Sequence, residues 1–280
     1  MRALVTGAGG FSGRHLVAYL ARDHSAEIYC TSATSKDGNN WFCCDLTERQ
    51  AVSRLIEEVA PDQIYHLAGL NSSDLDADYR VNVLSARNIL ETIIETKKQC
   101  RVLLIGSSAE YGFVPEEDNP VKEDHALTPM NIYGLTKVYQ TYLMKFYHLR
   151  YNLDVVMARP FNLMGRGAPT NLFIGRIYEQ IEAFQAGRTA KIEVGNLENR
   201  RDYIPIEKAV SYYALIMQRG KPGEIYNVGS GTSIPIRDLL KQTLEKNGLS
   251  MAVVEEQKTE PLYKFDIKNL VADIGKLKML

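Results

Sequence analysis

The feature that most constrains the fold is the alternation of short apolar runs with longer amphipathic runs over the first 160 residues. The short runs have the composition of β-strands and cover 2–7, 27–32, 63–69, 101–108 and 154–160. Between them, apolar residues recur at helical spacing over about 11–22, 47–59, 79–98 and 132–151. Near-continuous apolar strands separated by helices are typical of a parallel sheet that is covered on both faces.

Right-handed crossovers between such strands build a doubly wound sheet of the Rossmann type. After Pro160 a Gly/Pro/Asn-rich stretch leads into an expected helix near 172–186 and a strand, KIEVGN. The segments DYIPIEKAVSYYALIMQ and EIYNVGS then look like a return to the first domain. We therefore predict an α/β fold with a dinucleotide-binding domain (1–160 plus about 204–234) and a smaller C-terminal substrate lobe (about 161–203 plus 235–280).

Composition excludes several classes of protein. Apolar residues make up 45% and charged residues 24% of the chain, and the formal net charge is −1, so neither nucleic acid nor a membrane is an expected partner. No apolar run approaches the roughly 18 residues that span a bilayer. The chain begins directly on a strand without a basic leader, so we expect a cytoplasmic protein.

Cysteines and histidines show no metal-binding or disulfide pattern. Cys30, Cys43, Cys44 and Cys100 have no C-x-x-C spacing, and the five histidines do not cluster. Reduced thiols and no metal are therefore expected.

The first strand runs into the glycine-rich turn GAGGFSG. The fingerprint G-x-G-x-x-G fails because position 12 is Ser12, but Gly7, Gly10 and Gly13 give G-x-x-G-x-x-G. Gly7 permits the tight turn, Gly10 allows a pyrophosphate to approach the backbone, and Gly13 lets the helix pack on the sheet. The helix N-terminus supplies free N–H groups for phosphate, although a purely structural turn has the same appearance.

Other strands also end in small or polar residues. Ala68–Gly69, Ser107–Ser108 and Pro160–Asn162 all follow predicted strands. Ligands of open α/β sheets bind beyond the carboxyl ends of the strands, so these groups are expected at one site with the glycine turn.

The second strand ends in Thr31 and Ser32, with Lys36 nearby and no acid. An acid there binds the ribose hydroxyls of NAD, whereas hydroxyls and a lysine tolerate a 2′-phosphate. NADP(H) is therefore favoured, with NAD(H) left open. Asp45 could reach the adenine edge or be an ordinary loop residue.

In NIYGLTK, Tyr133 and Lys137 are four residues apart on a predicted helix and share one face. An ammonium near a phenol is expected to lower the pKa of Tyr133 and to suit it to proton exchange with a sugar or carbonyl oxygen. Exposed Tyr and Lys on a helix give the same spacing. The hydroxyl-bearing strand end GSSAEYG, about 25 residues upstream, favours the catalytic interpretation.

The chain resembles the extended short-chain dehydrogenases/reductases that act on nucleotide sugars. The resemblance covers nearly the whole chain and rests on the glycine turn, Asp45-Leu46, HLAG (66–69), Asn82, GSSAEYG (106–112), Tyr133/Lys137, RPFN (159–162), RRDYIPI (200–206) and YNVGSG (226–231). It implies that Tyr133 is the catalytic acid/base, that Lys137 also binds the nicotinamide ribose, and that Ser107 bonds the substrate oxygen, with Ser108 as a possible partner.

The pattern and the resemblance together assign two sets of binding residues. The cofactor set is Gly7, Gly10, Phe11, Ser12, Gly13, Thr31, Ser32, Asp45, Leu46, Leu67, Ala68, Gly69, Asn82, Tyr133, Lys137 and Pro160. The substrate set is Ser108, Ala109, Asn162, Asn171, Leu172, Arg176, Val194, Asn196 and Arg201.

The residue two positions after Ser107 separates the reactions of this family. Dehydratases carry an acid there, but this chain has Ala109, and Glu110 falls on the opposite face if the segment is extended. The resemblance thus implies an NADP(H)-dependent reductase of a 4-keto sugar nucleotide. A 4-epimerase or 4,6-dehydratase with tightly held NAD remains the alternative, and a non-catalytic nucleotide-binding protein is a third.

VGNLENRRDYIPIEKA is most similar to reductases of GDP-4-keto-6-deoxymannose, in which an arginine serves the nucleotide. Arg200 or Arg201 suits the pyrophosphate of the substrate. Glu260 stands where such reductases carry a C-terminal arginine, so Lys264 substitutes for it or the base is not guanine. The helices 79–98 and 132–151 either pair across a two-fold axis, giving the homodimer common in the family, or are covered by their own sheet.

Overall fold

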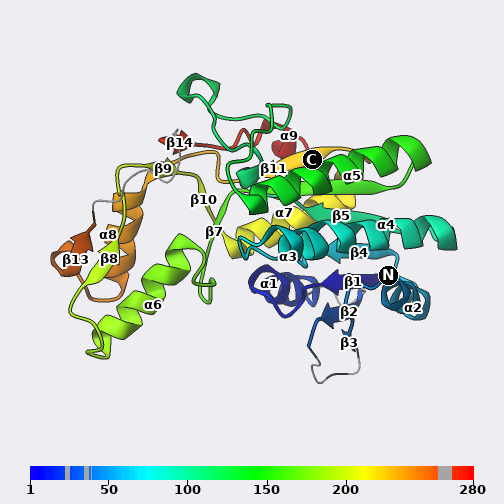
Figure 1. Cartoon of the computed structure of the whole chain (residues 1–280), viewed down its shortest axis with the longest axis horizontal. Coiled ribbons are helices and arrows are strands. Elements are labelled where there is room, and N and C mark those ends of the chain that lie inside the picture. The colour runs from blue at the N-terminus through cyan, green and yellow to red at the C-terminus, as the bar shows by residue number, and fades with distance from the viewer. Residues whose placement is uncertain (23–25, 35–37, 39, 258–266) are drawn as a thin grey trace.

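The computed structural model describes residues 1–22, 26–34, 38, 40–257 and 267–280. Its centre is a seven-stranded parallel sheet with the order β11-β6-β5-β4-β1-β2-β3 (Figure 1). The strands are β1 (Arg2–Thr6), β2 (Glu27–Ser32), β3 (Trp41–Cys43), β4 (Gln63–His66), β5 (Arg101–Ile105), β6 (Val155–Pro160) and β11 (Ile225–Val228). The doubly wound Rossmann-type fold predicted from the sequence is confirmed.

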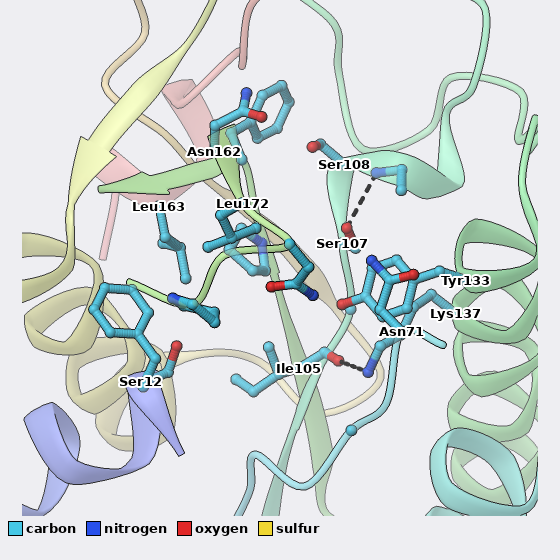
Figure 2. Close-up of a pocket in the computed structure, with 18 of the residues that line it drawn as sticks. Ser12, Asn71, Ile105, Ser107, Ser108, Tyr133, Lys137, Asn162, Leu163 and Leu172 are labelled. Carbon is cyan, nitrogen blue, oxygen red and sulfur yellow. Dashed lines mark hydrogen bonds between the residues drawn. The ribbon is translucent and has the colours of Figure 1, made fainter. Parts of the chain in front are cut away.

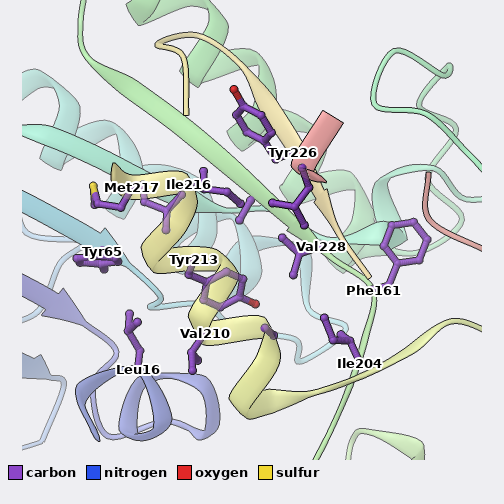
Figure 3. Packing of buried hydrophobic residues seen from close by; sticks show 14 of the residues in the cluster. Leu16, Tyr65, Phe161, Ile204, Val210, Tyr213, Ile216, Met217, Tyr226 and Val228 are labelled. Atoms are coloured by element: carbon purple, nitrogen blue, oxygen red, sulfur yellow. The ribbon is translucent and has the colours of Figure 1, made fainter. Parts of the chain in front are cut away.

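Helices cover both faces of this sheet because alternate strand residues point to opposite sides. On one face α1 (Phe11–Leu20) and α7 (Ile206–Arg219) pack on side chains such as Val5 and Leu103. Figure 3 shows the contribution of α7 to this core, which includes Val210, Tyr213, Ile216 and Met217. On the other face α2 (Arg49–Val59), α4 (Ser85–Thr96) and α5 (Ile132–Tyr151) pack on side chains such as Leu4 and Leu104.

Three local features differ from the sequence prediction. Strand β3 was not predicted, since three residues are too few to show a periodicity. The helix expected at 79–98 is α3 (Leu75–Tyr79), a π-helical turn (Arg80–Leu84) and α4 in succession. Strands β4 and β5 end at His66 and Ile105, so the small and polar residues that follow them are loops.

The second lobe contains α6 (Phe173–Gln185) and α8 (Ile236–Lys246), and it has its own apolar core. Strand β8 (Ile192–Val194) pairs with β13 (Val254–Glu256), which follows the 3₁₀ turn Met251–Val253. Two further small sheets join β10 (Tyr203–Pro205) to β7 (Asn162–Met164), and β9 (Arg200–Arg201) to β12 (Ile234–Pro235) and β14 (Asn269–Leu270). The carboxyl ends of the central strands face this lobe (Figure 1).

The C-terminal segment of the chain packs with strand β11 of the central sheet. Ala272, Ile274 and Leu277, the last of them in α9 (Gly275–Lys278), belong to the same core cluster as Val228 of β11. The sequence placed all of 235–280 in the second lobe. We propose instead that the segment after β14 belongs to the dinucleotide-binding domain.

In the described part of the chain no helix has the length and apolarity needed to cross a membrane. The same residues contain no group of three or more His, Cys, Asp or Glu side chains placed to hold a metal ion. Cys43, Cys44 and Cys100 are free thiols.

Candidate active site

Two adjoining cavities open at the carboxyl ends of the central strands. The central cavity, of about 520 Å³, lies between the sheet, α5 and the second lobe. The side pocket, of about 360 Å³, lies beyond the glycine turn and between the ends of β2 and β4. Gly7, Gly10, Leu67 and Gly69 line both, so one elongated ligand can occupy the two together.

The glycine turn has little room for side chains. Gly7 has φ +63°, and a Cβ atom there would lie 2.7 Å from the backbone N of Ala68. A Cβ on Gly13 would lie 2.2 Å from the carbonyl O of Gly7, whereas one on Gly10 would lie 3.2 Å from the same atom. Helix α1 follows Gly10 without a side-chain cap, so N–H groups of its first turn are available to phosphate oxygens.

The side pocket has the groups that an adenosine moiety needs. Thr31, Ser32, Asp45, Leu46 and Ala68 line it. The hydroxyl of Thr31 is buried and has no hydrogen-bond partner among the described residues, which fits a site for a ribose or phosphate oxygen. Oδ1 of Asp45 accepts hydrogen bonds from the N–H (2.9 Å) and the hydroxyl (2.8 Å) of Thr47. Lys36, which the sequence placed near this pocket, lies outside the described residues.

Ser107, Tyr133 and Lys137 meet in the central cavity (Figure 2). Ser107 follows β5, and Tyr133 lies in the first turn of α5, which begins where Oδ1 of Asn131 accepts the N–H of Gly134 at 2.7 Å. The Nζ atom of Lys137 lies 5.7 Å from the centre of the Tyr133 ring. It donates hydrogen bonds to the carbonyl O of Ile105 (2.8 Å) and to Oε1 of Gln140 (3.1 Å).

Burial controls the protonation of this pair. Burial raises the pKa of Tyr133 to about 12, and a hydrogen bond with Ser107 opposes the increase. Burial lowers the pKa of Lys137 to about 8, against the attraction of the Glu110 and Asp78 carboxylates. The expectation of a lowered Tyr133 pKa is therefore wrong for the structure as described, because desolvation of the phenolate outweighs the hydrogen bond with Ser107, and the Glu110 and Asp78 carboxylates raise the pKa further.

Glu110 points away from the cavity. Residues Ser108–Glu110 form a 3₁₀ turn in which Ser107 is the N-cap, and Oε1 of Glu110 accepts the backbone N–H of Ser107 at 2.8 Å. Its Oε2 atom accepts from the hydroxyl of Thr141 (2.6 Å) and from Arg159 (2.9 Å). The described residues that line the central cavity include no carboxylate.

The two sets of predicted binding residues are placed as follows. The cavities are lined by every member of the cofactor set except Asn82. Asn82 is buried and holds the loop after β4, since its side chain bonds both the N–H and the carbonyl of Leu70, each at 2.8 Å. Of the substrate set, the central cavity is lined by Ser108, Ala109, Asn162, Asn171, Leu172 and Arg201.

Three predicted substrate residues do not line the cavity. Arg176 and Asn196 are exposed, and Val194 packs in the core of the second lobe. Of the two candidate arginines, Arg201 lines the cavity, whereas Arg200 bonds the hydroxyl (3.2 Å) and the carbonyl (2.8 Å) of Ser233. Glu260 and Lys264 lie outside the described residues.

The sequence analysis missed Asn71, which lines the cavity on the same side as Tyr133 and Lys137 (Figure 2). Its loop is held on both sides, by Asn82 at Leu70 and by Asp78, which accepts the N–H (2.9 Å) and the hydroxyl (2.6 Å) of Ser72. Polar residues after HLAG were the available signal, but they are equally common in surface loops. Other cavity residues that were missed include Leu70, Met130, Asn131, Leu163, Ile267 and Leu270.

Comparisons with known proteins agree with this geometry. Residues 3–229 match the model of the NAD dependent epimerase/dehydratase family. GDP-6-deoxy-D-mannose reductase of Pseudomonas aeruginosa is 29% identical over 261 residues, which are 91% of this chain and 83% of that protein. GDP-6-deoxy-D-talose 4-dehydrogenase of Aggregatibacter actinomycetemcomitans is 26% identical and covers 99% of this chain and 90% of its own length.

A similar solved structure is that of RMD from Pseudomonas aeruginosa complexed with NADPH. It superimposes with a TM-score of 0.85 at 26% identity and covers 99% of this chain and 90% of that chain. These findings confirm the predicted resemblance to extended short-chain dehydrogenases/reductases and the predicted cofactor, NADP(H) or NAD(H).

Proposed function

Because the chain belongs to the NAD dependent epimerase/dehydratase family, we propose that it reduces the 4-keto group of a nucleotide-linked 4-keto-6-deoxyhexose with NADPH. The supporting observation is that Ser107, Tyr133 and Lys137 converge on a cavity without a carboxylate among its described lining residues. Reduction needs one hydride and one proton. Elimination of water also needs a group that removes a proton from carbon, and Ala109 at the expected position has none.

Tyr133 and Ser107 each have one role in this proposal. Bound NADPH supplies the hydride that forms the new C–H bond at C4. The high pKa of Tyr133, about 12, keeps its phenol protonated at neutral pH, so it can transfer its proton to the former carbonyl oxygen. Ser107 donates a hydrogen bond to that oxygen, and the phenolate of Tyr133 regains a proton from water.

The side pocket favours NADP(H) over NAD(H). Strand β2 ends in Thr31 and Ser32, and the Asp45 carboxylate lies on a different segment and bonds Thr47. Thr31, Ser32 and the backbone at the end of β2 would hold the 2′-phosphate of NADP(H). The similar RMD structure contains NADPH, which agrees with this choice.

We further propose that the substrate is GDP-linked, of the GDP-4-keto-6-deoxymannose type. Two relatives at 29% and 26% identity act, by name, on GDP-6-deoxyhexoses. Arg201 lies in the cavity wall, where a guanidinium group can bind the two phosphates of a nucleoside diphosphate.

The test is the oxidation of NADPH, followed by its absorbance, when GDP-4-keto-6-deoxymannose is added, with the sugar product identified by NMR. We expect stoichiometric consumption of NADPH and loss of turnover in Tyr133→Phe. A 4-epimerase or 4,6-dehydratase would instead be isolated with bound NAD and would convert a sugar nucleotide without net consumption of cofactor. That result would overturn the reductase proposal.

We also propose a homodimer that acts in the cytoplasm, in which the free thiols remain reduced. Tyr139, Tyr142, Phe146 and Leu149 lie on one face of α5 and are 47%, 60%, 53% and 82% exposed. Tyr79 of the neighbouring α3 extends this surface, with its ring 5.9 Å from that of Tyr139. An apolar helix face of this kind suits burial against a second copy of the same face.

A further inference from the structure

Glu110 is a fully buried carboxylate behind the catalytic loop, and no step of the proposed reaction uses it. Its position is tightly determined by the backbone. A Cβ atom on Gly106 would lie 2.4 Å from Oε1 of Glu110, so the glycine at 106 is what lets the carboxylate reach the loop. The carboxylate therefore packs directly beneath the peptide that connects β5 to Ser107.

The two oxygens of Glu110 join the two segments that carry the catalytic residues. Oε1 accepts the N–H of Ser107 at 2.8 Å, on the loop after β5. Oε2 accepts the hydroxyl of Thr141 at 2.6 Å, on α5. Thr141 lies one turn after Lys137 on α5, so this hydrogen bond links the carboxylate to the helix that carries Tyr133 and Lys137.

Arg159 balances the charge of this carboxylate. The pair is 2.9 Å apart, and both side chains are almost completely buried, at 1% and 0% exposure. Arg159 also donates to the hydroxyl of Tyr111 (2.9 Å), which donates to Oδ1 of Asn227 in β11 (2.7 Å). Buried ion pairs are seldom more stable than apolar side chains of the same size, so stability alone does not account for this one.

We propose that Glu110 is a positioning residue, which holds the hydroxyl of Ser107 against the phenol of Tyr133 by accepting the Ser107 N–H while it is anchored to Thr141 and Arg159. Ser107 is the N-cap of the 3₁₀ turn, and its Oγ atom accepts the N–H of Ala109 at 3.2 Å. Glu110, in the same turn, accepts the backbone N–H of Ser107, which completes a capping box. The expected effect on catalysis rests on the proposed function, whereas the expected effect on the environment of the Tyr133 phenol does not.

Two double variants separate the role of Glu110 as a hydrogen-bond acceptor from the effect of its negative charge. Glu110→Gln/Arg159→Met removes the ion pair but keeps an oxygen that can accept the Ser107 N–H. Glu110→Met/Arg159→Met also removes the ion pair and has no such oxygen. Neither leaves an uncompensated buried charge, and both lose the Arg159–Tyr111 hydrogen bond equally.

The first measurement needs no substrate. In protein labelled with ¹³C at tyrosine Cζ, the Tyr133 signal, assigned with Tyr133→Phe, reports hydrogen bonding to its phenol. Ser107→Ala gives the shift that follows from losing the Ser107 hydroxyl. We expect Glu110→Met/Arg159→Met to reproduce the Ser107→Ala shift and Glu110→Gln/Arg159→Met to stay near the wild-type value. A Tyr133 signal that is the same in both double variants would overturn the proposal.

The second measurement is steady-state kinetics with NADPH and the keto sugar nucleotide. We expect kcat to be about tenfold lower in Glu110→Met/Arg159→Met than in Glu110→Gln/Arg159→Met, with similar KM, because a misplaced catalytic group slows the chemical step. Equal kcat values would contradict the proposal. Wild-type protein that is inactive on every keto sugar nucleotide would refute the proposed function alone, and the NMR comparison would still decide this inference.

If circular dichroism shows that the double variants do not fold, Glu110→Asp replaces them in the same NMR comparison. It retains the charge opposite Arg159 and withdraws the carboxylate by one methylene from the Ser107 N–H. A shift toward the Ser107→Ala value supports the positioning role, and a wild-type value contradicts it.

Discussion

Lys137 carries its positive charge only up to moderately alkaline pH. Burial lowers the pKa of its ammonium group from 10.5 to about 8, so in the free protein it is charged below about pH 8 and neutral above. If this ammonium group binds the nicotinamide ribose, as the resemblance implies, NADPH should bind several-fold more weakly at pH 9.5 than at pH 7.5. The measurement is the Kd for NADPH by fluorescence titration across that range.

The matched control is Lys137→Met, which binds more weakly at every pH but has no group of this kind to titrate. Its Kd should vary less with pH than that of the wild type. Parallel pH profiles in the two proteins would show that Lys137 does not control the affinity.

His66 makes the fold sensitive to acid. It is 1% exposed and bonds the hydroxyls of Thr6 (2.8 Å) and Ser85 (3.1 Å), and burial with the nearby Lys137 charge lowers its pKa from 6.5 to about 3. Between these two pKa values only the unfolded chain binds the proton, so stability is complete above pH 6.5 and is lost as the pH falls toward 3. The loss from this group between pH 6.5 and 5 should be about 1–2 kcal/mol.

Urea unfolding at pH 7 and pH 5 measures this loss. His66→Asn is less stable at pH 7 but lacks the titrating group, so its free energy of unfolding should fall less between the two pH values than that of the wild type. Equal decreases would assign the acid sensitivity to other residues.

At the scale of elements, helix α1 depends on glycine where it meets strand β1. A Cβ on Gly13 would collide with the carbonyl of Gly7 at 2.2 Å, whereas one on Gly10 would lie 3.2 Å from it. Gly13→Ala should therefore cost about 1–3 kcal/mol of stability and weaken NADPH binding, since backbone has to move. Gly10→Ala is the matched control and should cost clearly less stability, as thermal unfolding with and without NADPH would show. A larger loss in Gly10→Ala would contradict this description of the turn.

The sequence predicts the elements well where periodicity is long and poorly where it is interrupted. Helices α1, α2 and α5 match their predicted ranges closely, because a stripe of apolar residues repeats over several turns. The π-helical turn at Arg80–Leu84 changes the local repeat and was not expected. Strands β4 and β5 end earlier than their apolar runs suggest, and Leu67 and Gly106, each one residue beyond its strand, line the central cavity.

At the scale of the whole molecule, the exposed apolar face of α5 predicts an interface between two copies of the chain. Phe146→Glu places a charge at the centre of that face and should convert the proposed dimer to a monomer, as light scattering after size-exclusion chromatography would show. Met279→Glu is the control, since Met279 is 80% exposed and is the C-cap residue of α9 rather than a residue of α5. A wild-type protein that is monomeric, or an unchanged dimer in Phe146→Glu, would refute this interface.

The sequence by itself determined the doubly wound sheet, the glycine turn and the choice of Ser107, Tyr133 and Lys137 as candidate catalytic residues. Repeating apolar patterns and residues at short spacing fix structure within one segment, so they can be recognised without the rest of the fold. Only the tertiary structure decided that the pKa of Tyr133 is raised and that Glu110 points into the core and away from the cavity. It also decided that Arg201 rather than Arg200, and Asn71, line the cavity. Burial and contact depend on segments far apart in the chain, such as Glu110 with Arg159, and no local pattern records which of them meet.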